Sequence, residues 1–120
     1  METVSIIIQL VIALGIFNVW ILRYGKSTNW RGGTAKTMRE EFEVYGLPVW
    51  FMQCIGGLKI LLAALLIAGI WISALTMPAA IGMAVLMSGA IIMHFKVKDP
   101  LQKSMPAFTM LVLSVAVAVL

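Results

Sequence analysis

The sequence predicts an all-α, polytopic membrane protein, a bundle of four transmembrane helices with a short interfacial helix between helices 1 and 2. Hydrophobic residues make up 62% of the 120-residue chain and charged residues only 12%, which is too apolar for a soluble domain of this size. Between Lys59 and Lys96, a run of 36 residues contains no Asp, Glu, Lys or Arg. A single helix of that length would measure about 54 Å against a hydrocarbon core of about 30 Å, so the run is expected to cross the membrane twice.

Apolar stretches and helix-start signals divide the chain into four spans of one membrane domain, residues 1–120. Their expected bounds are residues 4–22, 48–72, 77–95 and 104–120. Pro48, Pro78 and Pro106 fall in the first turns of the last three spans, where a helix can do without a backbone N–H. The first span has no basic residue ahead of it and no convincing cleavage site, so a retained helix is expected rather than a signal peptide.

The segment 34–45 is expected to form the interfacial helix. Its apolar residues recur at three- and four-residue spacing, Thr34 can cap its start, and Gly46 can end it. Such a helix would lie along the membrane surface. It would serve either as an anchor there or as a lid over the mouth of the bundle.

Basic residues are confined almost entirely to two loops, which sets the expected orientation. Loop 23–47 contains five Lys or Arg residues and loop 96–103 contains three, whereas the other loop and both ends contain none. The positive-inside rule then places both loops in the cytoplasm and both termini on the other side of a cell inner membrane. The loops and lipid headgroups account for the net charge of +4, and no base-reading motif accompanies it, so nucleic-acid binding is not expected.

One charged residue, Lys59, falls inside a predicted span. Counting from the helix ends places Asn18, Ser88 and His94 at compatible depth, with Gln53 about one and a half turns before the lysine. These five residues are candidates for a polar, ligand-binding cleft near the cytoplasmic side. Hydrogen-bond donors with one imidazole would suit a carbonyl or quinone headgroup, an anion, or proton transfer. The simpler alternative is a lysine that snorkels to the interface and an interfacial histidine.

The loops contribute five further candidates: Arg31, Gly32, Gly33, Glu41 and Asp99. The glycine pair lacks the spacing of a phosphate-binding loop and is expected to supply a turn. Asp99 is expected to cap the last helix or to pair with an arginine of the first loop. Glu41 is one of the acids that could fold inward as a countercharge for the buried lysine.

The chain offers little for metal binding or for catalysis of its own. Cys54 is the one cysteine and His94 the one histidine, which cannot make the usual zinc set. No Ser-His-Asp or Cys-His arrangement is recognisable. No metal, no evident cofactor and no self-sufficient enzyme are therefore expected.

Several segments resemble the DoxX-like family of DoxX/MauE-type membrane proteins: Asn18-Val-Trp-Ile-Leu-Arg23, Arg31-Gly-Gly-Thr-Ala-Lys36, Met38-Arg-Glu-Glu-Phe42, Tyr45-Gly-Leu-Pro48, Gly57-Leu-Lys59, and His94 through Asp99-Pro-Leu101. The likeness covers almost the whole chain and implies a compact four-helix protein whose biochemical role is poorly defined. The name-giving members are similar to small subunits of thiosulfate:quinone oxidoreductases, which implies a quinone site with Lys59 and His94 as candidate headgroup donors. A distant branch, which includes the nicotinic acetylcholine receptor chaperone, implies binding to other membrane proteins during assembly.

The sequence therefore predicts a non-catalytic accessory subunit or lipophilic-ligand binder in the lipid bilayer. The first alternative is the membrane subunit of a quinone-linked oxidoreductase of the thiosulfate:quinone type, with an oxidoreductase or another membrane protein as its partner. The second alternative is transport of small molecules or protons, for which a chain of this length would require a homodimer. Rows of small residues on the helices permit such a homo-oligomer.

Overall fold

The computed structural model describes residues 2–26 and 30–120, and every regular element in those residues is helical. The long helices are α1 (Glu2–Phe17), which continues into the π-helical turn η1 (Asn18–Leu22), α3 (Val49–Ala68), α4 (Thr76–Lys96) and α5 (Leu101–Val119). A short helix α2 (Met38–Tyr45) and a 3₁₀ turn η2 (Ser73–Leu75) connect them. Four segments of the described chain are long and apolar enough to cross a membrane. The predicted four-span helical architecture, with a short helix between the first two spans, is confirmed.

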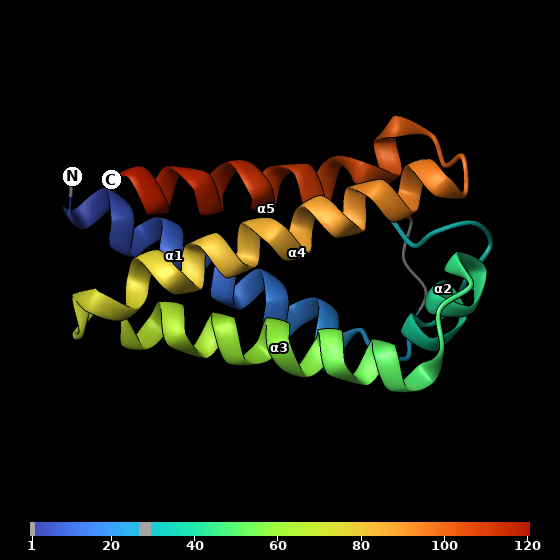
Figure 1. The fold of residues 1–120 in the computed structure, drawn as a ribbon, viewed down its shortest axis with the longest axis horizontal. Helices are drawn as coiled ribbons and strands as arrows, with labels where there is room; N and C mark the ends of the chain where they lie inside the picture. Colours follow the sequence, from blue (N-terminus) through green and yellow to red (C-terminus); the bar gives the residue numbers. More distant parts are fainter. Residues whose placement is uncertain (1, 27–29) are drawn as a thin grey trace.

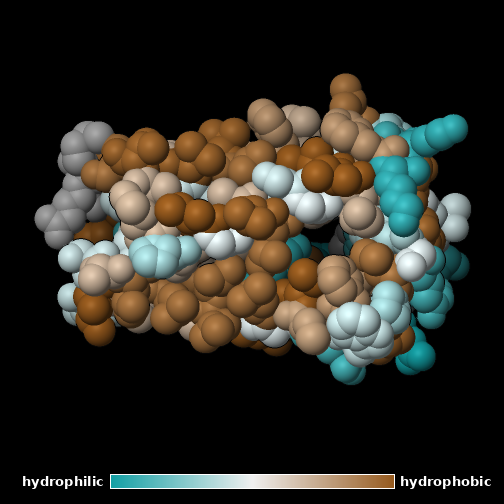
Figure 2. Space-filling model, in the orientation of Figure 1, coloured by the Kyte–Doolittle hydropathy of each residue, from teal (hydrophilic) through white to brown (hydrophobic). Residues whose placement is uncertain are grey.

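The long helices run side by side along a molecule that measures 40 Å in its longest direction. The chain ends and the α3–α4 connection lie at one end of the bundle, whereas α2 and the α4–α5 connection lie at the other (Figure 1). We call this second end, residues 23–26, 30–48 and 97–100, the loop end. Figure 2 shows that the strongly hydrophilic side chains gather mostly there, beside a largely hydrophobic flank. The two basic loops thus share one end, and the side of the membrane that this end faces stays a prediction.

Two bounds of the membrane-spanning helices differ from the predicted ones. α3 ends at Ala68 rather than near residue 72. The Gly69 N–H still bonds to the Leu65 oxygen four residues back, but the Ile70 N–H bonds to the Ile67 oxygen only three residues back. α5 begins at Leu101 rather than at residue 104, with Pro100 as its N-cap. Pro106 therefore lies inside the helix and not in its first turn, which corrects the predicted bound.

α2 begins at Met38, and its N-cap is Thr37 rather than the predicted Thr34. The Thr37 hydroxyl accepts a hydrogen bond from the Glu40 N–H at 3.1 Å, and the Glu40 carboxylate accepts one from the Lys36 N–H at 2.8 Å. These two bonds satisfy the N–H groups of Lys36 and Glu40 at the start of the helix. Gly46 ends the helix with a φ of +78°, as expected. The apolar face of α2 is buried against α3 and α4, so the helix covers the loop end of the bundle.

The bundle is packed most tightly in its half nearer the chain ends. Fully buried small residues there, Ala13, Ala63, Ala79 and Ala80, let neighbouring helices approach closely. The half nearer the loop end contains bulkier side chains and a cavity. The close packing therefore holds the helices together at one end while leaving space at the other.

Gln9 forms a buried polar contact that the sequence did not single out. Its amide donates to the Leu66 carbonyl oxygen at 2.8 Å and to the Thr76 hydroxyl oxygen at 3.3 Å. Because the Ile70 N–H bonds to Ile67 instead, the Leu66 oxygen is one of the orphan acceptors at the end of α3. Gln9 supplies a partner for it, which ties α1 to the start of the α3–α4 turn.

Candidate functional site

A cavity of about 780 Å³ lies at the loop end, enclosed by α2 and the four long helices. Apolar residues such as Ile16, Phe51, Ile55, Met87 and Ala90 form most of its wall. Its polar lining contains Asn18, Arg23, Arg31, Glu41, Lys59, His94 and Lys103. Figure 2 shows its mouth as a hollow between α3 and α4, in the half of the bundle nearer the loop end. This size and this mixture of many apolar groups with few polar ones are typical of small-ligand pockets.

Lys59 lies near the middle of α3 and is only 9% exposed. It is ten residues after Val49, or about 15 Å along the helix. Helical side chains lean toward the N-terminus of their helix, and α3 begins at the loop end, so the amine is directed into the cavity. Its Nζ lies 5.5 Å from the centroid of the Trp20 ring, a cation–π contact. Within the described residues, Nζ makes no hydrogen bond or ion pair with a protein group.

Trp20 is placed beside Lys59 by an unusual helix turn and by a glycine. The Arg23 N–H bonds to the Asn18 oxygen five residues back, at 2.8 Å, which gives η1 its wider π-helical turn. A Cβ atom at Gly56 would lie 2.4 Å from the indole ring, so only glycine lets the ring rest against α3. The indole also meets the ring of Phe42 edge-on, with centroids 6.0 Å apart. Trp20 therefore joins the first span, α2 and α3 at the cavity wall.

His94 and Asp99 form a pair at the end of α4. Nδ1 of His94 lies 2.8 Å from Oδ2 of Asp99, and the other carboxylate oxygen accepts from the Gly33 N–H at 2.9 Å. Burial by itself raises the pKa of Asp99, but the hydrogen bonds from His94 and Gly33, with Lys103 nearby, outweigh it and hold that pKa below its ordinary value. The ionised carboxylate can only accept, so Nδ1 carries the proton between them. In neutral His94 the lone pair is then on Nε2.

This pairing corrects the role expected for Asp99. The carboxylate does not cap α5, whose N-cap is Pro100, and the first-loop arginine that forms a buried ion pair, Arg31, does so with Glu41. Lys98 adopts a positive φ of 59°, and the Asp99 N–H bonds to the His94 oxygen at 3.0 Å. The tight turn brings the two side chains together.

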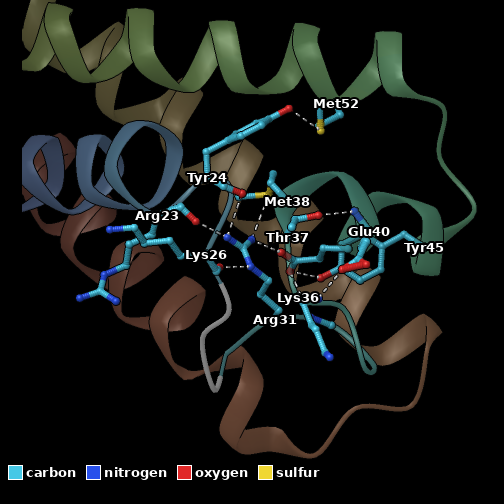
Figure 3. A network of polar contacts seen from close by, with 12 residues as sticks. Arg23, Tyr24, Lys26, Arg31, Lys36, Thr37, Met38, Glu40, Tyr45 and Met52 are labelled. Carbon is cyan, nitrogen blue, oxygen red and sulfur yellow. Dashed lines mark hydrogen bonds and ion pairs between the residues drawn. The ribbon is translucent and has the colours of Figure 1, made fainter.

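Arg31 organises the first loop from within (Figure 3). Nη1 lies 3.2 Å from a carboxylate oxygen of Glu41. The guanidinium also donates to backbone carbonyl oxygens of residues 23, 24 and 26. Although it lines the cavity, Arg31 is therefore already saturated by protein acceptors and serves mainly to hold the loop.

Glu41 is equally committed to protein partners. Its second oxygen accepts from the Gly32 N–H at 3.2 Å and from the Tyr45 hydroxyl at 2.6 Å. Burial and the neighbouring carboxylate raise the pKa of Tyr45, so the hydroxyl remains a donor. Because both oxygens are engaged, Glu41 is not free to form a direct ion pair with Lys59.

The structure brings together three of the five predicted cleft residues. Lys59, His94 and Asn18 line the cavity, whereas Ser88 and Gln53 do not. Gln53 is exposed on α3, and the Ser88 hydroxyl donates to the Ala84 carbonyl oxygen of its own helix at 2.9 Å. Of the five loop candidates, likewise, some line the cavity and some do not.

Arg31 and Glu41 line the cavity, while Gly32, Gly33 and Asp99 hold its rim through hydrogen bonds. Sequence reasoning did not place Trp20, Tyr45, Arg23 or Lys103 at the site, although all four line the cavity. Tyr45 falls within the segment 34–45 that the sequence predicts as an interfacial helix. Trp20 points into the cavity because of the turn η1, and Tyr45 does so because of the placement of α2.

Groups suited to metal coordination are absent from the described residues. No three His, Cys, Asp or Glu side chains come together there, and Cys54 is exposed. What the cavity offers is an amine, an imidazole and an amide above apolar walls.

Comparison with known proteins identifies the family. Residues 26–119 match the DoxX-like family, a range that includes α2, α3, α4, α5 and the Arg31, Lys59 and His94 side chains of the cavity. No curated protein and no solved structure matches the chain. Because the match covers most of the sequence, the chain belongs to the DoxX-like family.

Proposed function

We propose that this membrane protein is a non-catalytic accessory protein that holds a lipophilic ligand in the loop-end cavity. The observation that carries the proposal is the buried Lys59, which is directed into that space and has no hydrogen-bond or ion-pair partner among the described residues. A charged lysine within a span costs on the order of 2.5 to 3.5 kcal/mol even on insertion scales. A ligand headgroup that accepts from Nζ accounts for a residue that packing alone would disfavour, and the apolar walls suit the rest of the ligand.

A binding role agrees better with the sequence than an independent redox enzyme does. The chain contains one cysteine and no cofactor-binding motif. Chemistry on the ligand would then fall to a partner protein. Copurification of a stoichiometric partner with the ligand-loaded chain is the result that this role predicts.

The direct test is native mass spectrometry of protein released gently from its membrane. Wild type should carry one lipophilic molecule per chain, and Lys59→Met should lose it. Lys36→Met is the matched control, because Lys36 is an exposed loop lysine outside the cavity lining. A wild-type protein without ligand, or a Lys59→Met variant that keeps it, would contradict the proposal.

The loop end is proposed to face the cytoplasm of a cell inner membrane. The supporting observation is that both basic loops lie at that end (Figure 1). A single cysteine at the exposed Thr34 position, in a Cys54→Ala background, should react with a membrane-impermeant maleimide only after the cytoplasm is opened. Labelling in intact cells would reverse the orientation.

A second candidate function is the membrane subunit of a quinone-linked oxidoreductase. The observation in its favour is that Lys59 and His94 line one cavity, with Asp99 fixing the tautomer of the imidazole. An amine donor and an imidazole nitrogen match the carbonyl and hydroxyl groups of quinone and quinol. Absorbance of the copurified ligand that changes on reduction with borohydride would favour this candidate, whereas a ligand without such absorbance would exclude it.

A further inference from the structure

We infer that the ligand is an amphiphile with an anionic headgroup, a carboxylate or a phosphate, and that it enters the cavity from the bilayer between α3 and α4. The inference rests on the proposed function and specifies its ligand class and entry route. Three observations carry it: the charge balance of the lining, the position of the cavity mouth, and the open space at Gly89.

The ionisable lining is predominantly cationic. Besides His94 and Tyr45, it contains four lysines or arginines and one acid: Arg23, Arg31, Lys59, Lys103 and Glu41. Glu41 is bound by Arg31, and Lys103 lies 4.0 Å from Asp99 while donating to the Gly33 carbonyl oxygen. Within the described residues, Lys59 and Arg23 therefore have no acidic partner. Arg23 is exposed and donates to the Asn18 side-chain oxygen at 3.3 Å, so the buried charge that lacks a counterion is that of Lys59.

An anion suits this imbalance better than a neutral headgroup. A carbonyl oxygen would satisfy one N–H of Lys59 but would leave its charge in surroundings of low dielectric constant. A carboxylate or phosphate would accept the same hydrogen bond and cancel the charge, and such charge-assisted bonds are roughly twice as strong as neutral ones. The cavity therefore selects for negative charge close to Nζ.

The mouth of the cavity opens on the apolar flank of the bundle. α3 and α4 lie close together near the η2 turn and separate toward the loop end (Figure 1). The hollow between them in Figure 2 is bordered mainly by hydrophobic surface. Val85 of α4 both lines the cavity and is 65% exposed, so it lies where the cavity meets the surface of the bundle. At the loop end α2 covers the bundle, whereas the lateral mouth (Figure 2) offers a hydrocarbon chain a route from the bilayer.

Gly89 is a lining residue of α4 with empty space beside it. A Cβ atom built at this lining position would meet nothing within 4 Å. A larger side chain should therefore fit without disturbing the fold while narrowing the cavity. Gly57 provides a matched control, since its Cβ would also meet nothing within 4 Å, but it is exposed on α3 and outside the lining.

The headgroup is tested by titrating delipidated protein with oleate, methyl oleate or inorganic phosphate and counting bound molecules by native mass spectrometry. Oleate should bind one per chain and roughly tenfold or more tighter than methyl oleate, because a buried charge pair is lost in the ester. Phosphate alone should not bind. Lys59→Met should lower the affinity for oleate to that for methyl oleate.

The entry route is tested by the rate of oleate uptake from nanodiscs. Gly89→Leu should slow uptake several-fold, whereas Gly57→Leu should leave it unchanged. If Gly89→Leu does not fold, Val85→Trp places comparable bulk at an exposed position of the same wall. Equal uptake by a folded wall variant and Gly57→Leu would overturn lateral entry.

The remaining outcomes separate this inference from the function on which it rests. Equal affinities for oleate and methyl oleate would overturn the anionic headgroup but would support a lipophilic ligand. Binding of phosphate as tightly as oleate would overturn the requirement for a chain. If wild type copurifies with no lipophilic molecule and binds neither oleate nor methyl oleate, the proposed function fails as well.

Discussion

The imidazole of His94 and the carboxylate of Asp99 meet at 2.8 Å across the residues where α4 ends. The contact depends on the turn at Lys98, which adopts a positive φ. The other oxygen of Asp99 binds the N–H of Gly33, which belongs to a segment 66 residues away in the sequence. One carboxylate therefore fixes the orientation of a cavity imidazole and ties the first loop to the α4–α5 turn.

Replacing Asp99 with asparagine should loosen this rim. The amide keeps the shape of the side chain but loses the charge and one of the two acceptor oxygens, so one buried partner is left unsatisfied. The expected loss is about 1–3 kcal/mol, seen as a lower thermal unfolding temperature in detergent and faster proteolysis within residues 30–36. Glu43→Gln is the control, because that acid is exposed and its ion pair with Arg39 is long. Similar losses in the two variants would argue against a rim held by Asp99.

The same carboxylate makes stability depend on acidity. The pKa of Asp99 in the folded protein lies below its ordinary value of 3.8, so the unfolded chain binds the proton more tightly. Its contribution is present above the unfolded pKa and is lost as the pH falls through the lower, folded pKa. As the pH is lowered from roughly 5 to 2, the thermal unfolding temperature of wild type should fall more steeply than that of Asp99→Asn. Parallel curves for the two proteins would contradict this linkage.

Lys59→Met should stabilise the ligand-free protein. The substitution removes a charge that costs on the order of 2.5 to 3.5 kcal/mol within a span and forfeits a cation–π contact worth about 0.5–2 kcal/mol. The net expectation is a higher unfolding temperature in detergent, with no change for Lys36→Met. Higher stability together with lost ligand would mean that the lysine is retained for binding. Lower stability would instead make Lys59 a structural residue.

The spans could be predicted because hydropathy and charge determine them locally, but the facing of individual residues could not be read from depth alone. Gln53 and Lys59 are six residues apart, as are Ser88 and His94. Six residues rotate an α-helix by about 240° beyond one full turn, so members of each pair point in different directions. Only one of each pair lines the cavity. The partner of Asp99 was missed for a related reason, because a turn through a non-glycine residue with positive φ has no strong sequence signal.

Gln9→Leu should destabilise the end of the bundle that contains the chain termini. Leucine fills a similar volume but leaves the Leu66 carbonyl oxygen without the hydrogen bond at 2.8 Å, and it removes the contact with Thr76. The expected loss is about 1–3 kcal/mol of unfolding free energy, measured by thermal or denaturant unfolding in detergent. Gln53→Leu is the matched control, since that glutamine is exposed on the flank of α3. An equal effect of the two leucines would show that Gln9 contributes no specific bond.

Gly56→Ala should disturb the cavity through Trp20, and its neighbour supplies the control. A Cβ at position 56 would lie 2.4 Å from the indole ring, closer than atoms can approach, so the ring must leave its place beside Lys59. The overpacking should cost about 1–3 kcal/mol and change the fluorescence of Trp20, best recorded with the three exposed tryptophans, Trp30, Trp50 and Trp71, replaced by phenylalanine. Gly57→Ala meets no atom within 4 Å and should gain up to about 1 kcal/mol from the better helix propensity of alanine. Opposite signs at adjacent glycines would show that contact with Trp20, and not a general intolerance of α3 to substitution, sets the shape of the cavity around Lys59.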